Sequence, residues 1–212
     1  MLKRTFLFLA FSCLVSSRLL AQDHARASVH APPPAVMQPA YGAKLQIDGI
    51  PNAGKISEVL YRGAQPLDKG LPELKKLGIT TIIDLRGEDR EKIKWERKQA
   101  ESLGIAFVHI SVSGWSPPTD EQVAQFLSLF RNDPEQKIFV HCRFGNDRTG
   151  VFVAIYRMAL EKWPADQAMK EMYFFGFNGF WHPSMKTFIR EFPARLKSSP
   201  SLASLQAQAL PH

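Results

Sequence analysis

Residues 140–150 read VHCRFGNDRTG, and they stand between two apolar runs. The run before them, KIFV, predicts a buried strand, and the run after them, VFVAIYRMAL, predicts a helix. A loop between a strand end and a helix start turns backbone N–H groups inward, and the helix N-terminus adds a partial positive charge. Such a loop is suited to bind phosphate-like anions.

Strand and helix signals alternate on the N-terminal side of this loop. Strands are expected at 58–63, 79–86, 105–112 and 137–141, and helices at 67–78, 88–104 and 119–130. Alternation of this kind favours a single α/β domain with a central, mostly parallel sheet of about four to five strands flanked by helices. In such sheets ligands bind at the carboxyl ends of the strands, which is where this loop begins.

The whole 212-residue chain divides into four segments. Residues 1–21 have the pattern of a secretory signal peptide, and Arg18 interrupts an apolar stretch that is already short for a membrane anchor. Residues 22–44 are expected to be a flexible Ala/Pro-rich leader, 45–196 the folded domain and 197–212 a loose C-terminal tail. We therefore expect a periplasmic or secreted protein with no stable membrane anchor after cleavage.

The composition limits the class of ligand. A formal net charge of +7 would attract an anionic substrate. The sequence has no basic run or zinc-finger spacing of the kind that nucleic-acid-binding proteins carry, and its histidines are scattered. We expect no nucleic-acid partner and no metal site.

Cys142 is the only cysteine left once a signal peptide containing Cys13 is removed, so no internal disulfide is expected. A free cysteine is often an inert buried hydrophobe. Here, however, Arg148 follows after five residues and can grip two phosphate oxygens, Gly145 permits a close backbone approach, and the Thr149 hydroxyl can donate to the sulfur. A positive loop also favours the reactive thiolate, so we interpret Cys142 as a nucleophile.

The stretch HCRFGNDRTG resembles the active-site signature of the cysteine-dependent protein tyrosine phosphatase superfamily. The upstream stretches IPNAGKISEVLYRGAQP and LGITTIIDLR resemble the atypical dual-specificity phosphatases of plants, fungi and bacteria. The resemblance covers roughly residues 46–192.

This resemblance implies a phosphatase that hydrolyses phosphate monoesters of the phosphotyrosine type through a cysteinyl-phosphate intermediate, and the signal-peptide pattern adds that it is exported. Cys142 would attack the phosphorus, and no cofactor or metal would be needed. The substrate would be a phosphorylated protein or a small-molecule phosphate. The residues implied to bind its phosphate are Arg143, Phe144, Gly145, Asn146, Arg148 and Thr149.

The family also uses a general acid, for which two aspartates compete. Asp120 is the only aspartate in SVSGWSPPTDEQ (111–122), the stretch that leads into the 119–130 helix, but it equally suits the first turn of that helix, where a carboxylate favours the dipole. Asp147 stands inside the signature loop and resembles the acid assigned in myotubularins, although it could instead brace the loop. A third possibility is that no side chain supplies the proton.

A weak acid would favour leaving groups that need little protonation, such as phenolate or phosphate. An inositol polyphosphate or pyrophosphate phosphatase therefore stays open as an alternative. A second alternative, from another class of protein, is a non-catalytic phosphate-binding module.

Arg62 and Arg86 fall at strand ends near the expected site. They could add positive charge there or could be ordinary packing arginines, and we place neither in the catalytic set.

Overall fold

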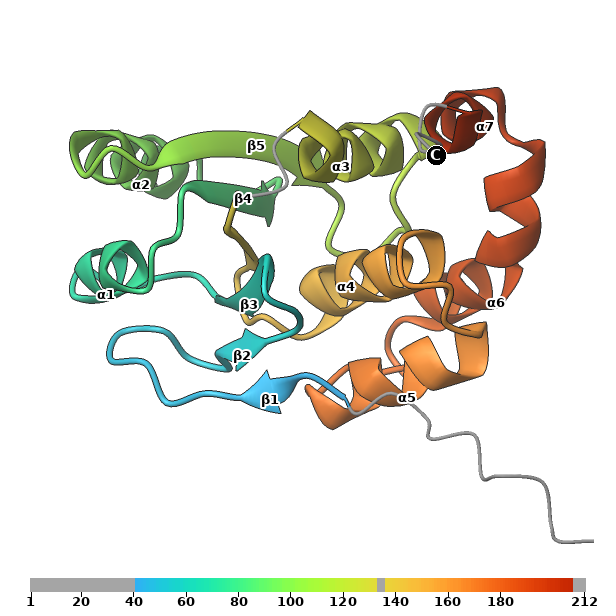
Figure 1. Ribbon diagram of the computed structural model, residues 1–212. Helices are drawn as coiled ribbons and strands as arrows, with labels where there is room; N and C mark the ends of the chain where they lie inside the picture. The colour runs from blue at the N-terminus through green and yellow to red at the C-terminus, as the bar shows by residue number, and fades with distance from the viewer. Residues whose placement is uncertain (1–40, 133–135, 208–212) are drawn as a thin grey trace, which may run out of the picture. The chain divides into compact units, whose positions relative to one another are not determined.

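The computed structural model describes residues 41–132 and 136–207, which form a six-stranded mixed sheet with helices on both faces (Figure 1). The strand order is β1-β2-β3-β6-β4-β5, in which the last four are parallel and β1 and β2 add an antiparallel edge. In chain order the elements are β1 (Ala43–Lys44), β2 (Gly54–Lys55), β3 (Leu60–Ala64), α1 (Gly70–Lys76), β4 (Thr81–Arg86), α2 (Arg90–Ser102), β5 (Ala106–Val112), α3 (Asp120–Asn132), β6 (Ile138–Cys142), α4 (Asp147–Ala159), α5 (Ala165–Phe174), α6 (Pro183–Ser198) and α7 (Pro200–Ala207).

The helices divide between the two faces of the sheet (Figure 1). Helices α1 and α2 cover one face, where Leu71 and Ile93 share a core with Phe139 of β6. Helices α3 to α7 lie on the other side, where Phe152 of α4 shares a core with Val140. Burying a side chain such as Phe152 contributes about 1.5–3 kcal/mol, so these two cores hold the sheet between the helical layers.

Strand β6 sends successive side chains to opposite faces, as the pleat requires. Val140 and Cys142 belong to the α4 side, whereas Phe139 and His141 stack on each other on the α2 side. The thiol and its neighbouring imidazole therefore stand on opposite sides of the sheet.

The expected α/β domain and its strands and helices are confirmed, with boundaries that differ by a few residues. Two short edge strands raise the strand number to six, and α5, α6 and α7 were not predicted.

The structure differs from expectation at the domain ends. Strand β1 lies inside the segment expected to be a leader, and α6 and α7 occupy much of the expected loose tail. The reason at the C-terminal end is Leu202 of α7, an apolar side chain that is fully buried. The expected signal peptide, residues 22–40 of the leader and residues 208–212 lie outside the described residues. Across 41–132 and 136–207, no helix has the length and apolarity needed to cross a membrane.

Candidate active site

The loop from Cys142 to Arg148 connects the end of β6 to the start of α4. It passes so close to β3 that Gly145 has no room for a side chain: a Cβ there would lie 2.6 Å from the backbone carbonyl of Gly63. Gly145 also has a φ of +72°, which residues with a Cβ rarely adopt. Glycine is therefore required by both space and backbone geometry.

Two carbonyls of the loop are held on its outer side. The Cys142 carbonyl accepts from His141 Nδ1 at 3.4 Å, and the Arg143 carbonyl accepts from the Gln65 N–H at 3.4 Å. Because the C=O and N–H of a trans peptide point in opposite directions, the N–H groups of Arg143 and Phe144 point away from these anchors. This arrangement leaves them free for an anion.

A third carbonyl, that of Gly145, is held by two donors. Asn52 Nδ2 lies 3.2 Å from it, and Arg62 Nη2 also donates to it. Asn52 additionally donates to Asn146 Oδ1 at 2.8 Å. The N–H of Asn146 is consequently the third loop donor turned away from the anchors.

Arg148 is buried and is held by Glu88 through two contacts of 2.7 Å, one from each terminal nitrogen. The hydrogen bond from Arg148 lowers the pKa of Glu88 to about 2. Burial opposes the charge on Arg148, but the bond to Glu88 and the Cys142 charge outweigh it and raise the pKa of Arg148. Glu88 thus fixes the guanidinium beside the thiol.

Cys142 and Arg148 line one cavity of about 680 Å³. Two exposed aromatic rings, Trp115 and Phe144, stand in its wall. The other lining residues are Gly87, Glu88, Ser111, Val112, Ser113, Gly114, Arg143, Asp147 and His182.

Asp120, the first candidate acid, does not line this cavity. Its Oδ1 lies 3.3 Å from Arg195 Nη1 of α6, and it borders a separate hollow with Glu191 and Ser199. The first helical turn aims the carboxylate at α6, so the proposed acid role of Asp120 is not supported by its position.

Asp147, the second candidate, does line the cavity. Its Oδ1 accepts from the Asn178 N–H at 2.9 Å, and its Oδ2 lies 3.4 Å from His182 Nε2. His182 was not predicted as a site residue. It stands against Trp115 with ring centroids 5.4 Å apart, and Asp147 and His182 meet in the cavity wall.

The expected contact from Thr149 to the sulfur is not made in this structure. Thr149 is fully buried in the first turn of α4, and its Oγ1 has no hydrogen-bond partner among the described residues. Its hydroxyl is therefore available to a nearby acceptor.

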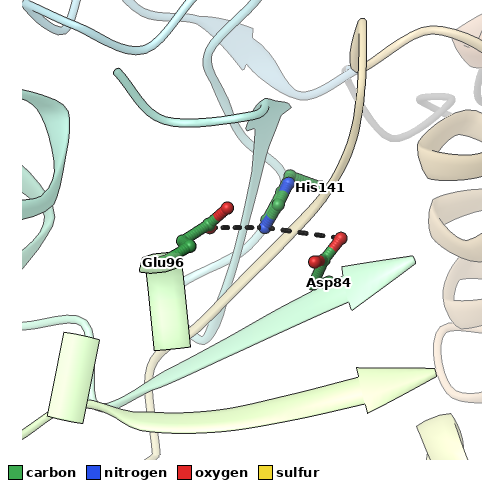
Figure 2. Close-up of side chains that lie close together, drawn as sticks. All are labelled: Asp84, Glu96 and His141. Carbon is green, nitrogen blue, oxygen red and sulfur yellow. Dashed lines mark ion pairs between the residues drawn. The ribbon is translucent and has the colours of Figure 1, made fainter. Parts of the chain in front are cut away.

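A cluster of four buried charged residues lies behind the loop, on the α2 side of the sheet. His141 Nε2 lies 2.9 Å from Glu96 Oε1 and 4.0 Å from Asp84 Oδ1 (Figure 2). Arg86 Nη2 lies 2.8 Å from Asp84 Oδ2 and 2.6 Å from Glu96 Oε2. Burial disfavours a charged imidazole, but the two carboxylates outweigh it and raise the pKa of His141.

With His141 protonated, two cations balance two carboxylates in this cluster. Asp84, Glu96 and His141 are close enough to hold a metal ion. Arg86, however, already places a cation on both carboxylates, so the donor set does not fit a further positive ion.

Residues 46–187, more than half of the chain, match the family model described as DSP-PTPase phosphatase fused to NAD+ Kinase. The chain belongs to this phosphatase family. TpbA of Pseudomonas aeruginosa, a dual specificity protein phosphatase, is 31% identical over 137 residues, which cover 62% of this chain and 57% of TpbA. OCA1 of Mycosarcoma maydis is 31% identical over 126 residues, which cover 57% of this chain and 77% of OCA1.

Solved structures of relatives share the fold. The crystal structure of TpbA has a TM-score of 0.62 at 22% identity and covers 81% of this chain and 98% of that one. The catalytic domain of the PP-IP phosphatase SIW14 from S. cerevisiae has a TM-score of 0.61 at 20% identity, with coverage of 77% and 98%. The expected superfamily and the expectation of a phosphatase enzyme are confirmed.

Proposed function

We propose that this phosphatase hydrolyses aryl phosphate monoesters of the phosphotyrosine type through a cysteinyl-phosphate intermediate. The observation that carries the proposal is one cavity in which Cys142 and Arg148 meet, with Trp115 and Phe144 in its wall. The loop N–H groups and Arg148 suit a phosphate, and the two exposed rings suit an aromatic group attached to it.

In the proposed reaction, Cys142 Sγ attacks the phosphorus and forms an S–P bond while the P–O bond to the phenol breaks. Arg148 and the loop N–H groups stabilise the charge on the non-bridging oxygens as it develops. Water then attacks the cysteinyl phosphate, the S–P bond breaks, and inorganic phosphate leaves with the thiolate restored.

The proton supply of the cavity favours an aryl over an alkyl leaving group. Asp120 faces α6, and both carboxylate oxygens of Asp147 already contact Asn178 or His182. A phenol, with a pKa near 10, leaves with little protonation, whereas an alkoxide depends on it. Phosphoserine should accordingly be a poor substrate.

The alternative of an inositol pyrophosphate substrate draws on the fold shared with SIW14 and on the same weak need for an acid. The charged side chains that line the cavity do not favour an inositol pyrophosphate substrate. Arg143 and Arg148 are offset there by Glu88 and Asp147, which suits one phosphate group better than a ring of several. The alternative of a binding module without turnover is disfavoured because nucleophile and arginine are both present.

We also propose that the protein acts outside the cytoplasm after removal of residues 1–21. The support is the signal-peptide pattern at the N-terminus. Expression with a C-terminal tag, followed by fractionation and N-terminal sequencing, tests this; a mature chain that still begins at Met1 would contradict it.

The test of the activity is turnover of an aryl phosphate in the presence of a chelator. The wild-type chain should release phosphate, and Cys142→Ser should release none while still binding inorganic phosphate in calorimetry, because the loop survives the substitution. A panel of phosphotyrosine peptide, phosphoserine peptide and inositol pyrophosphate then decides the substrate class. Absence of turnover by the wild-type chain, with phosphate binding intact, would favour the binding module.

A further inference from the structure

Arg62 of β3 is a completely buried guanidinium beneath the phosphate loop. One terminal nitrogen donates to the Gly145 carbonyl, and the guanidinium lies 4.2 Å from the ring centre of Phe175. Its other two nitrogens, Nε and Nη1, are buried and have no hydrogen-bond partner among the described residues. A buried cation in such surroundings is costly unless an opposite charge lies near.

The other buried arginines of the described chain each have a carboxylate. Arg86 pairs with Asp84 and Glu96, Arg148 with Glu88, and Arg157 with Glu171 and Glu161. Arg62 makes no ion pair among the described residues, and burial lowers its pKa to about 10, a shift that the charges of Cys142 and Glu171 partly reverse. Glu171 is already paired with Arg157, so a thiolate at Cys142 is the remaining group whose charge can balance Arg62.

The strand register explains why the two groups meet. Arg62 pairs with Val140 and Ala64 pairs with Cys142 across the parallel strands β3 and β6. Paired residues of adjacent strands project from the same face, and so do residues two apart. The side chains of Arg62 and Cys142 therefore lie on one side of the sheet, under the same loop.

We propose that Arg62 is a positioning residue of the active site, serving as the buried counter-charge of the Cys142 thiolate and holding the Gly145 carbonyl out of the phosphate cradle. This inference deepens the proposed function and rests on it. Arg62 itself does not touch the substrate, since it is fully enclosed. It acts on the substrate through the thiolate and through the orientation of the Asn146 N–H.

The charge role is tested by the pH dependence of Cys142 alkylation with iodoacetamide, followed by mass spectrometry of the Cys142 peptide. Arg62→Met removes the charge and keeps an unbranched chain, and its alkylation midpoint should rise by about 1 pH unit or more. Arg157→Met is the matched control, because Arg157 is also buried and also stacks on a ring, that of Trp163 at 4.1 Å. Its midpoint should equal that of the wild type even though the protein is destabilised.

Two further variants keep the test decisive. Arg62→Gln is neutral but retains a donor for the Gly145 carbonyl, so it replaces Arg62→Met if that chain does not fold and should show the same rise. Arg62→Lys restores the charge and should return the midpoint toward the wild-type value. A wild-type midpoint in either neutral variant, or a midpoint in Arg62→Lys as high as in the neutral variants, would overturn the counter-charge role.

The carbonyl role is measured separately as the affinity for inorganic phosphate. Arg62→Met should bind phosphate about tenfold more weakly than Arg62→Gln, because the Gly145 carbonyl then keeps only the contact from Asn52 and the loop donors turn away more easily. Equal affinity of these two variants contradicts that part. Alkylation and phosphate binding need no turnover, so failure of the Arg62 proposal is distinguishable from failure of the proposed activity, which would appear as a wild-type chain without turnover.

Discussion

Replacing Gly145 by alanine should disable the phosphate loop, because the added methyl group would meet the backbone of β3. An ideal Cβ at Gly145 lies 2.6 Å from the Gly63 C and O atoms and 2.7 Å from Ala64 N. Ordinary van der Waals contact begins at 3.4 Å, so the loop or the strand must move by about 0.8 Å. The partners of the clash are backbone atoms of a sheet strand, which cannot turn aside as a flexible side chain could.

The substitution Gly145→Ala lowers the stability of the fold in two ways. The φ of +72° strains any residue with a Cβ by roughly 1–2 kcal/mol, and the overpacking adds about 1–3 kcal/mol, so the free energy of unfolding should fall by about 2–5 kcal/mol. A shift of almost 1 Å at a site of reaction costs about 100-fold in rate. We expect kcat/KM for an aryl phosphate to fall by that factor.

Gly78 supplies the matched control for strain without a clash. Its φ is +81°, but the nearest atom to its ideal Cβ is 3.6 Å away, and it follows α1. Gly78→Ala should lose only the strain term in denaturant unfolding and should keep the wild-type kcat/KM. The reasoning is refuted if Gly145→Ala retains wild-type kcat/KM, or if its stability equals that of Gly78→Ala.

Four further substitutions test the site. Arg148→Lys should lose about 100-fold or more in kcat/KM although the charge remains, because a point charge cannot reproduce the two-pronged contact; wild-type kinetics would remove Arg148 from the mechanism. Asp147→Asn should slow alkyl phosphates more than activated aryl phosphates in parallel assays, whereas Asp120→Asn should leave the ratio of the two rates unchanged; an altered ratio in Asp120→Asn would restore it as the acid. The contact of Glu88 with Arg148 should stabilise the fold above about pH 4.5 and weaken as pH falls toward the Glu88 pKa of about 2. The stability difference between wild type and Glu88→Gln should therefore be constant above pH 5 and vanish near pH 2, and it should be under about 1 kcal/mol since Glu88 is partly exposed; a difference that does not depend on pH would contradict this assignment.

The phosphate loop and its flanking elements could be predicted because their signals are local. An apolar run, the spacing from Cys142 to Arg148, and Gly145 are all visible within eleven residues. The structure brings Cys142 and Arg148 into one cavity, as that spacing indicates. The elements beyond α4 carried weaker signals, and α7, which carries the buried Leu202, packs against α3, a helix far away in sequence.

Glu88 and His182 could not be assigned from the sequence with the same ease. Glu88 follows the end of β4, so the rule for carboxyl ends of parallel strands could have drawn attention to it. His182 is brought into the cavity by the turn between α5 and α6, and no local pattern indicates that. The orientation of Asp120 was likewise hidden, because a helical position does not reveal which neighbour the first turn faces.

Arg62 illustrates a different limit. Arginines are mostly exposed in folded proteins, so a packing or surface role was the ordinary interpretation for one at a strand end. Only the position of β3 beside β6 shows that this side chain is enclosed beneath the loop.

The alternation of β6 has a practical consequence for protein engineering. Cys142 faces the cavity, while His141 reaches Glu96 through the opposite face of the sheet. A substitution at Glu96 therefore reaches the residue next to the thiol from the α2 side, although Glu96 is not among the residues that line the cavity. Libraries built only from cavity-lining positions would leave this position out, whereas selection over the whole domain would include it.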